Sequence, residues 1–171
     1  GELFYPAFPG DPYYDDFITG EGAVLPPDIF PGGGPTALAE FFGDHMVVNG
    51  VIWPKEDVEP RNYRLHLLNG TDSRFMVIQF HSTDTDHLIP FYVIGSDQGL
   101  ASSATPVTKL LSEPGSRYDV VIDFKGRQGD HVIMENIGGD EPFGGDIPGP
   151  QLYAWTNRVM AFDVADMDDV M

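Results

Sequence analysis

Short runs in which apolar and polar residues alternate constrain the fold of this chain more than any other feature. In residues 117–124 an apolar side chain stands at every second position, from Tyr118 to Phe124. Successive residues of a β-strand point to opposite faces of a sheet, so this period of two predicts strands with one buried face. No segment keeps the period of about 3.6 residues that an amphipathic helix requires. The sequence therefore predicts an all-β protein.

Turn signals separate these runs. Asn49-Gly50 stands between two short apolar runs, and Asn-Gly is the strongest local signal for a β-hairpin because both residues tolerate a positive φ. Besides this hairpin at 47–53, strands are expected at 63–67, 74–81, 88–94, 107–111, 117–124, 130–136 and 152–164. Seven or eight short strands with turns between them predict a Greek-key β-sandwich of two sheets.

The first 40 residues differ in composition from the rest. Of the first 35 residues 14 are Gly or Pro, and no Lys or Arg precedes residue 55. Such a stretch forms few regular backbone hydrogen bonds. We expect residues 1–40 to form an irregular arm that its aromatic side chains pin to an apolar surface, or else a disordered linker. Residues 41–165 are expected to form the sandwich. Residues 166–171 are expected to be an acidic linker, and Asp163 is assigned to the same solvated tail.

Charge and cysteine content exclude several classes of function. The chain has 9 Lys and Arg against 27 Asp and Glu, for a net charge of -18. This excludes an electrostatic nucleic-acid binder and disfavours docking on an anionic membrane. No apolar run approaches the roughly 20 residues of a membrane span. Cysteine is absent, which excludes disulfides, a thiolate nucleophile, a zinc ribbon and a blue-copper centre.

No residue pattern in the sequence predicts a catalytic or metal site. His81 and His87 bracket a segment that contains two aspartates, and such a group could hold a divalent ion. A polar hairpin tip is the favoured interpretation, because nothing in the sequence would fix the imidazole tautomers. Asn69-Gly70-Thr71 has the form of a glycosylation sequon, but a tight turn explains it without a glycan.

Several runs, in order, resemble the middle domain of three-domain multicopper oxidases, in the laccase-like bacterial group that includes spore-coat oxidases, bilirubin-oxidase-like enzymes and phenoxazinone synthase. These runs are residues 1–6, 42–44, 48–54, 58–64, 68–74, 94–100 and 113–124. Each run is a weak signal, but their shared order and spacing over about 85 residues is specific. The Gly- and Pro-rich arm matches poorly.

This resemblance implies a cupredoxin-type sandwich that itself holds no copper and is inactive alone. It implies flanking cupredoxin domains as partners, with copper in the intact enzyme. That enzyme would oxidise phenolic or aminophenolic compounds or metal ions and reduce dioxygen to water. It would be secreted, periplasmic or on a spore or cell surface. The family's middle domain begins with a strand that this chain lacks, so a sheet edge would lie open and favour self-association unless residues 1–40 cover that edge.

The resemblance also implies roles for individual residues. Ion pairs at a domain seam are expected for Glu59, Arg61, Arg64 and Arg117, with solvated strand faces as the alternative. Tyr118 resembles a tyrosine corner, whose hydroxyl ties a loop. The structural motif residues are Asn49, Gly50, Trp53, Pro54, Glu59, Pro60, Arg61, Arg117, Tyr118 and Asp119. In the loop 138–150, the residues Gly139, Phe143 and Gly144 are candidates for a wall of the substrate entrance, or for an ordinary surface loop.

Two other classes of function stay open at this point. The first is a stand-alone acidic β-sandwich that binds a protein or glycan partner through its aromatic arm. The second is a small enzyme with a site of its own, for which no motif speaks. The absence of His-x-His and of Cys agrees with a middle domain and excludes a free-standing electron-transfer cupredoxin.

Overall fold

The computed structural model describes residues 42–140, 143–149 and 155–166. By its internal contacts the chain divides into Gly1–Gly43 and Asp44–Met171, and all described strands belong to the second unit. The predicted arm at 1–40 and most of the predicted acidic linker lie outside the described residues. Within the described ranges there is no helix at all, and so none that could cross a membrane.

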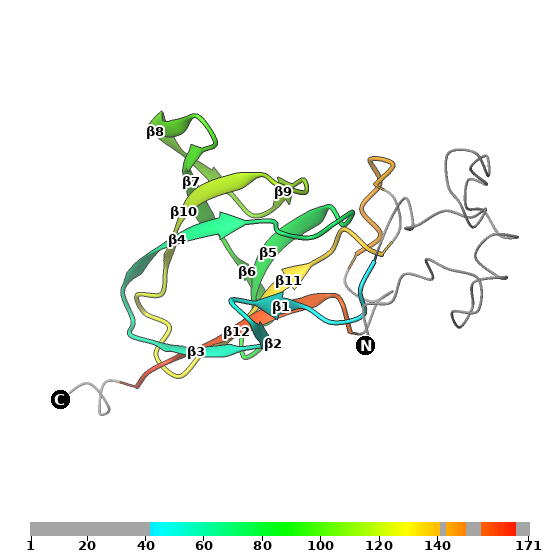
Figure 1. Ribbon diagram of the computed structural model, residues 1–171. Coiled ribbons are helices and arrows are strands. Elements are labelled where there is room, and N and C mark those ends of the chain that lie inside the picture. Colours follow the sequence, from blue (N-terminus) through cyan, green and yellow to red (C-terminus); the bar gives the residue numbers. More distant parts are fainter. Residues whose placement is uncertain (1–41, 141–142, 150–154, 167–171) are drawn as a thin grey trace, which may run out of the picture. The chain divides into compact units, whose positions relative to one another are not determined.

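The described residues form twelve strands, which lie in two main layers (Figure 1). The six-stranded sheet has the order β3-β12-β11-β5-β6, with β9 also paired to β5, and the four-stranded sheet has the order β4-β10-β7-β8. The strands are β1 (Val47–Val48), β2 (Val51–Ile52), β3 (Lys55–Val58), β4 (Asn62–Leu68), β5 (Met76–Ser82), β6 (His87–Ile89), β7 (Phe91–Ser96), β8 (Gly99–Val107), β9 (Leu110–Ser112), β10 (Arg117–Asp123), β11 (His131–Asn136) and β12 (Arg158–Val164). The predicted all-β class and the two-sheet sandwich are confirmed.

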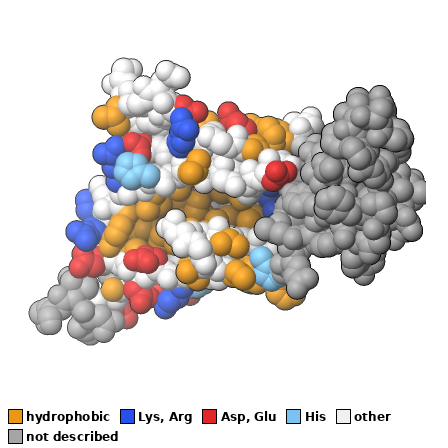
Figure 2. All heavy atoms as spheres, in the orientation of Figure 1, with side chains coloured by type: hydrophobic (Ala, Val, Ile, Leu, Met, Phe, Trp, Pro, Cys, Tyr) orange, Lys and Arg blue, Asp and Glu red, His pale blue; other side chains and the backbone are white. Residues whose placement is uncertain are grey.

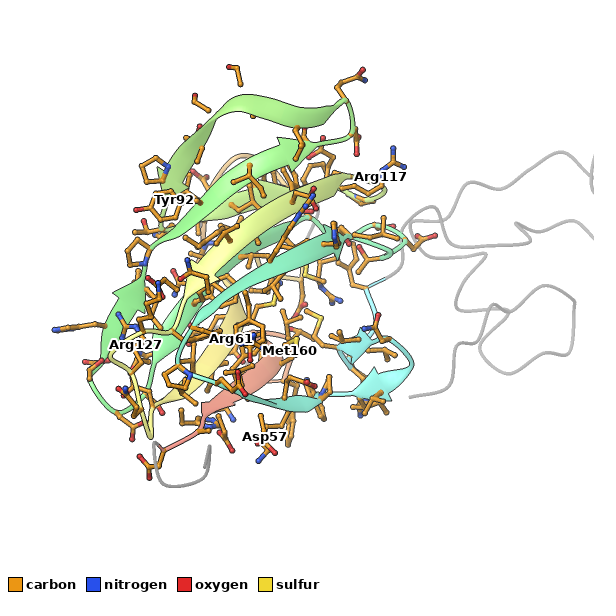
Figure 3. The ribbon with its side chains drawn as sticks, turned by 90° about the vertical axis from the view of Figure 1, so that its left-hand side faces the viewer. Asp57, Arg61, Tyr92, Arg117, Arg127 and Met160 are labelled. Carbon is orange, nitrogen blue, oxygen red and sulfur yellow. The ribbon has the colours of Figure 1, made fainter. Side chains whose placement is uncertain are left out.

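Aromatic side chains from both sheets meet in the core. Phe80 of β5 packs edge-to-face on Phe91 of β7, with ring centroids 5.0 Å apart. The ring centroid of Phe124, just after β10, lies 5.6 Å from that of Phe162 in β12. All four are buried. In Figure 3 the side chains fill the space between the sheets, with Tyr92 labelled on the four-stranded sheet and Asp57 on the other. Burial of these rings is the main force that holds the sheets together.

The predicted hairpin forms as the sequence indicates. Strands β1 and β2 pair antiparallel, with Val48 opposite Val51. Asn49 and Gly50 between them have φ of 50° and 85°, which are values that a type I′ turn needs and that Asn and Gly adopt most readily. Trp53, which follows the hairpin, also has a positive φ, of 43°. A short two-stranded element thus ends at the first tryptophan of the chain.

The single strand expected at 88–94 is in fact two strands that belong to different sheets. β6 pairs with β5 in the six-stranded sheet, and β7 pairs with β10 and β8 in the four-stranded sheet. Pro90 separates them and has no N–H to continue a ladder. Ile89 and Phe91 on either side of it are both buried. The chain therefore crosses from one layer to the other at this proline.

Two strands were not expected from the sequence. β3 lies between two prolines and buries only Val58, while its other three residues are exposed. It is held by parallel pairing with β12, which local patterns do not reveal. β8 is exposed along almost its whole length and so shows no alternation. Both strands depend on backbone pairing with distant residues.

The solvated tail predicted to include Asp163 begins later than expected, which corrects that assignment. Asp163 lies within β12 and pairs with Lys55 of β3, Nζ to Oδ2 at 2.7 Å, and with His131 of β11, Nδ1 to Oδ1 at 2.5 Å. Lys55 first, and then His131, hold the pKa of the Asp163 carboxyl below its usual value. This carboxylate therefore joins three strands on the outer face of the six-stranded sheet.

Candidate functional site

One side of the sandwich is open between the edge strands β4 and β3. In the described part of the chain each stands at the end of its sheet. The inward side chains of β4 (Tyr63, Leu65 and Leu67) are only half-buried, whereas Val120 and Ile122 of the neighbouring β10 have no exposed surface. Figure 2 shows apolar side chains in the hollow between these two edges. A recessed apolar surface of this kind is typical of an interaction site.

The charged motif residues pair within the chain. Glu59 and Arg61 form an ion pair of 2.8 Å, and Arg117 pairs with Asp97 at 3.0 Å. Asp119 of β10 accepts from Arg64 of β4 at 2.5 Å and also contacts His66. Hydrogen bonding from Arg64 lowers the pKa of the Asp119 carboxyl. These pairs brace the edge strand β4 and the ends of β10. Each of these charged motif residues has its ion-pair partner among the described residues.

Among the described residues, Tyr63 rather than Tyr118 ties down a loop. The Tyr63 hydroxyl oxygen accepts a hydrogen bond from the Glu59 backbone N–H at 2.9 Å, four residues upstream. Tyr118 packs against the core as its alternation predicts. Its hydroxyl forms no hydrogen bond to a described residue, and burial raises the pKa of this hydroxyl. The loop-tying role expected for Tyr118 thus falls to the tyrosine on the neighbouring strand.

The turn after β4 is organised by a buried asparagine. Asn69 is 6% exposed, and its Nδ2 donates to the carbonyls of Arg74 and Ser112 at 2.9 Å and 2.8 Å. Its Oδ1 accepts from the N–H and the hydroxyl of Thr71. Both amide hydrogens are therefore in use within the fold. This agrees with the interpretation of the sequon as a structural turn.

The candidate entrance loop is held to the sandwich at Asp140 and at Phe143. Arg74, which is buried, donates to Asp140 Oδ1 at 2.6 Å, and Thr156 donates to Asp140 Oδ2 at 2.5 Å. Phe143 stacks on Phe75 with ring centroids 5.2 Å apart. Gly139 has a φ of 85°, and a Cβ on Gly144 would meet nothing within 4 Å. The loop is therefore held to the sandwich next to β5.

The two histidines of the predicted hairpin tip have separate roles. β5 and β6 pair antiparallel around the tip. His81 Nδ1 lies 3.2 Å from Glu135 Oε1 and its Nε2 lies 3.0 Å from Asp86 Oδ1. His87 Nδ1 instead lies 2.9 Å from the Asp86 carbonyl oxygen. Burial acts to lower the pKa of His81, but the hydrogen bonds to Asp86 and Glu135 outweigh it and raise this pKa above its usual value.

A groove that the sequence did not indicate lies on the outer face of the six-stranded sheet. Its volume is about 280 Å³. Ile133 of β11 and Ala161 of β12, which are partners in register, form part of its floor. Trp53 and Trp155 form its wall, with ring centroids 5.9 Å apart.

The same groove carries basic groups and a further apolar one. Met160 also lines the groove, and His131 and Arg158 add basic groups. Trp53 and Trp155 are about 100 positions apart in the chain, so no local pattern could have joined them.

The donor groups of the described residues do not fit a blue-copper centre. Blue-copper sites require a cysteine thiolate with histidines, and the chain has no Cys. In the described ranges no three His, Cys, Asp or Glu side chains are grouped so as to hold a metal ion.

Sequence comparison places the relatives of this chain in one family. No protein-family model matches the chain. It is 39% identical over 130 residues to the bilirubin oxidase of Albifimbria verrucaria, covering 75% of this chain and 22% of that protein. It is 32% identical over 147 residues to the laccase of Bacillus subtilis, covering 86% of this chain and 24% of that protein. The chain thus spans about a quarter of the length of the curated relatives it matches.

Solved structures give the same result. A variant of the McoA multicopper oxidase of Aquifex aeolicus superposes with a TM-score of 0.62 at 28% identity, over 80% of this chain and 29% of that one. The laccase-like multicopper oxidase CueO of an Ochrobactrum species superposes with a TM-score of 0.56 at 29% identity, over 74% and 24%. The homologues and structural neighbours are multicopper oxidases, laccases among them, and the fold is a cupredoxin-type β-sandwich.

Proposed function

We propose that this chain is the copper-free middle domain of a three-domain, laccase-like multicopper oxidase. The observation that carries the proposal is the way the matches cover the chain. The relatives match 75% and 86% of this chain, yet the chain accounts for only 22% and 24% of them. A piece of that size corresponds to one domain among several. The lack of any cysteine further supports a position between domains that hold the metal.

On this proposal the intact enzyme oxidises phenolic or aminophenolic compounds or metal ions and reduces dioxygen to water. Copper is held by the flanking domains, and the protein is secreted, periplasmic or on a spore or cell surface. The share of this chain is geometric, because its described residues supply a rigid sandwich and no group of side chains arranged to hold a metal ion. It fixes the distance between the two flanking domains and contributes surface to the interfaces with them.

The open side between β4 and β3 is the surface that we assign to a flanking domain. The half-buried Leu65 and Leu67 there would lose their remaining contact with water when a neighbour covers them. Burying apolar area contributes about 25 cal/mol per Å². The ion pairs of Arg64 and Arg117 brace the strands behind this surface. Such a seam needs no metal and no titrating group.

The loop with Gly139, Phe143 and Gly144 is assigned to the wall of the substrate entrance. Its support is mechanical: Asp140 ties it to the buried Arg74, and Phe143 stacks on Phe75. Loops that carry recognition are commonly mounted in this way on a rigid scaffold.

The reading frame that encodes this chain tests the proposal. We expect a His-x-His motif upstream and a His-Cys-His motif downstream in the same frame. We also expect tightly held copper and dioxygen consumption in the longer product, and neither in the 171-residue chain after chelation and buffer exchange. Stoichiometric copper with dioxygen consumption in the short chain itself would overturn the proposal. A frame without either motif would favour the stand-alone partner-binding module instead.

A further inference from the structure

The groove on the outer face of the six-stranded sheet is suited to a flat apolar group. The outer face of a sandwich sheet is usually polar, because only the inner face packs on the core. Here Ile133 and Ala161 form an apolar floor, and both tryptophans of the chain stand beside it. Trp155 is 70% exposed. Indole rings offer a large flat surface on which planar rings stack in offset or edge-to-face geometry.

A basic side chain without an acidic partner lies at the same groove. The chain has six arginines. Five of them, Arg61, Arg64, Arg74, Arg117 and Arg127, form ion pairs with carboxylates. Arg158 forms none with the described residues, although the net charge of the chain is -18.

The register of the sheet explains why Arg158 is unpaired. Its partner across the strands is Glu135 of β11. The carboxylate of Glu135 is already engaged, with Oε2 accepting from Gln79 at 2.6 Å and Oε1 lying 3.2 Å from His81. The other basic group of the groove, His131, is paired with Asp163 at 2.5 Å. Arg158 is therefore the cation that remains for a ligand.

The size of the groove limits the ligand to a small one. Its volume is about 280 Å³, whereas a closed cavity of roughly 150 Å³ already holds benzene. A single ring with one substituent fits this space, and drug-sized ligands usually occupy larger pockets. An uncharged ring would leave the guanidinium unused. A carboxylate on the ring would receive paired N–H donors in the fork geometry that arginine offers.

We infer that the Trp53–Trp155 groove is a binding site for an aryl carboxylate, whose ring lies against the indoles and whose carboxylate pairs with Arg158. None of the residues that line this site belongs to β4 or β3, the strands of the open side assigned to a flanking domain, and the inference does not depend on the proposed function. It is a binding site and includes no chemical step.

The test uses the 171-residue chain with 4-fluorobenzoate as the probe and the uncharged 4-fluorobenzamide as its matched analogue. Binding is followed by the ¹⁹F signal of the probe. It is also followed by tryptophan fluorescence, which reports on the groove alone because the chain has only the two tryptophans. We expect saturable binding of the benzoate, about tenfold or more tighter than the amide, since a charge-assisted hydrogen bond is lost in the amide.

Three variants separate the site from general charge effects. Arg158→Gln should weaken benzoate binding about tenfold or more and leave the amide unchanged. Trp155→Leu should weaken both probes, because it removes the stacking surface. Lys125→Gln, which removes an exposed charge outside the groove, should change neither. Absence of saturable benzoate binding, or equal affinities in the wild type and Arg158→Gln, would overturn the inference.

Discussion

At the scale of single residues, buried polar side chains hold more of this fold together through hydrogen bonds than the histidines do. The side chain of Asn69 is almost fully buried. It forms hydrogen bonds with two carbonyls, one backbone N–H and one hydroxyl. The sequence identified it as part of a turn and a sequon. Its hydrogen bond to Ser112, 43 positions later, could not be foreseen, because β9 comes close only after the sheets assemble.

We predict that Asn69→Ala lowers the free energy of unfolding by about 2–4 kcal/mol, because it leaves several buried groups without partners. Asp72→Ala in the same turn is the control, since this side chain is exposed and its loss should cost within about 0.5 kcal/mol. Urea unfolding followed by fluorescence measures both. A cost for Asn69→Ala no larger than that for Asp72→Ala would contradict the role assigned to the buried amide.

His81 contributes to the pH dependence of stability. Its folded-state pKa is raised by Asp86 and Glu135 against the effect of burial. The stabilisation is therefore fully present below the unfolded pKa of about 6.5 and is lost as the pH rises through the folded pKa. We predict that the urea midpoint of the wild type falls between about pH 6 and about pH 8.

In His81→Gln the urea midpoint should fall less over this pH range than in the wild type. In His87→Gln it should fall as in the wild type, because His87 faces a backbone carbonyl instead of a carboxylate. The midpoints of the three proteins at several pH values provide the measurement. Parallel slopes in the wild type and His81→Gln would assign the pH dependence to other groups.

At the scale of elements, the loop after β11 shows how closely the backbone packs. A Cβ on Gly138 would lie 2.9 Å from the Phe75 carbonyl oxygen and 3.1 Å from Asn136 Oδ1. These are backbone and buried groups that cannot move independently. The sequence showed a glycine pair in a loop but not which glycine is required, because the requirement comes from the neighbouring strand.

We predict that Gly138→Ala destabilises the protein by about 1–3 kcal/mol through this overpacking. Gly144→Ala, in the same loop, has open space around its Cβ and should change stability by less than about 0.5 kcal/mol. Thermal unfolding of the two variants is the comparison. Equal melting temperatures would show that the loop relaxes without cost.

At the scale of the whole molecule, the open apolar side and the large net charge have opposite effects on self-association. The half-buried face of β4 favours association with another chain, whereas a net charge of -18 keeps copies apart at low ionic strength. Salt screens this repulsion, with a Debye length of about 10 Å at 0.1 M.

We predict that the isolated chain self-associates, and that association increases with salt. Leu65→Lys, which adds an inward charge to the edge strand, should shift the protein toward the monomer. Leu68→Lys, at a position that is 64% exposed on the outward face, should have little effect. Light scattering across a salt series measures this, with circular dichroism to confirm folding. A monodisperse monomer at all salt concentrations would refute the prediction.

The sequence by itself determined the strand class, the hairpin at Asn49-Gly50, the inward residues of β10, and the absence of cysteine chemistry. These properties are local, because side-chain period and turn chemistry act over a few residues. Only the tertiary structure decided that the chain changes sheets at Pro90, that β3 and β8 are strands, and that Asp163 joins Lys55 and His131. It alone brought Trp53 to Trp155 and left Arg158 without a carboxylate. Such contacts join residues far apart in the chain, and they exist only where packing of the two sheets fixes the register.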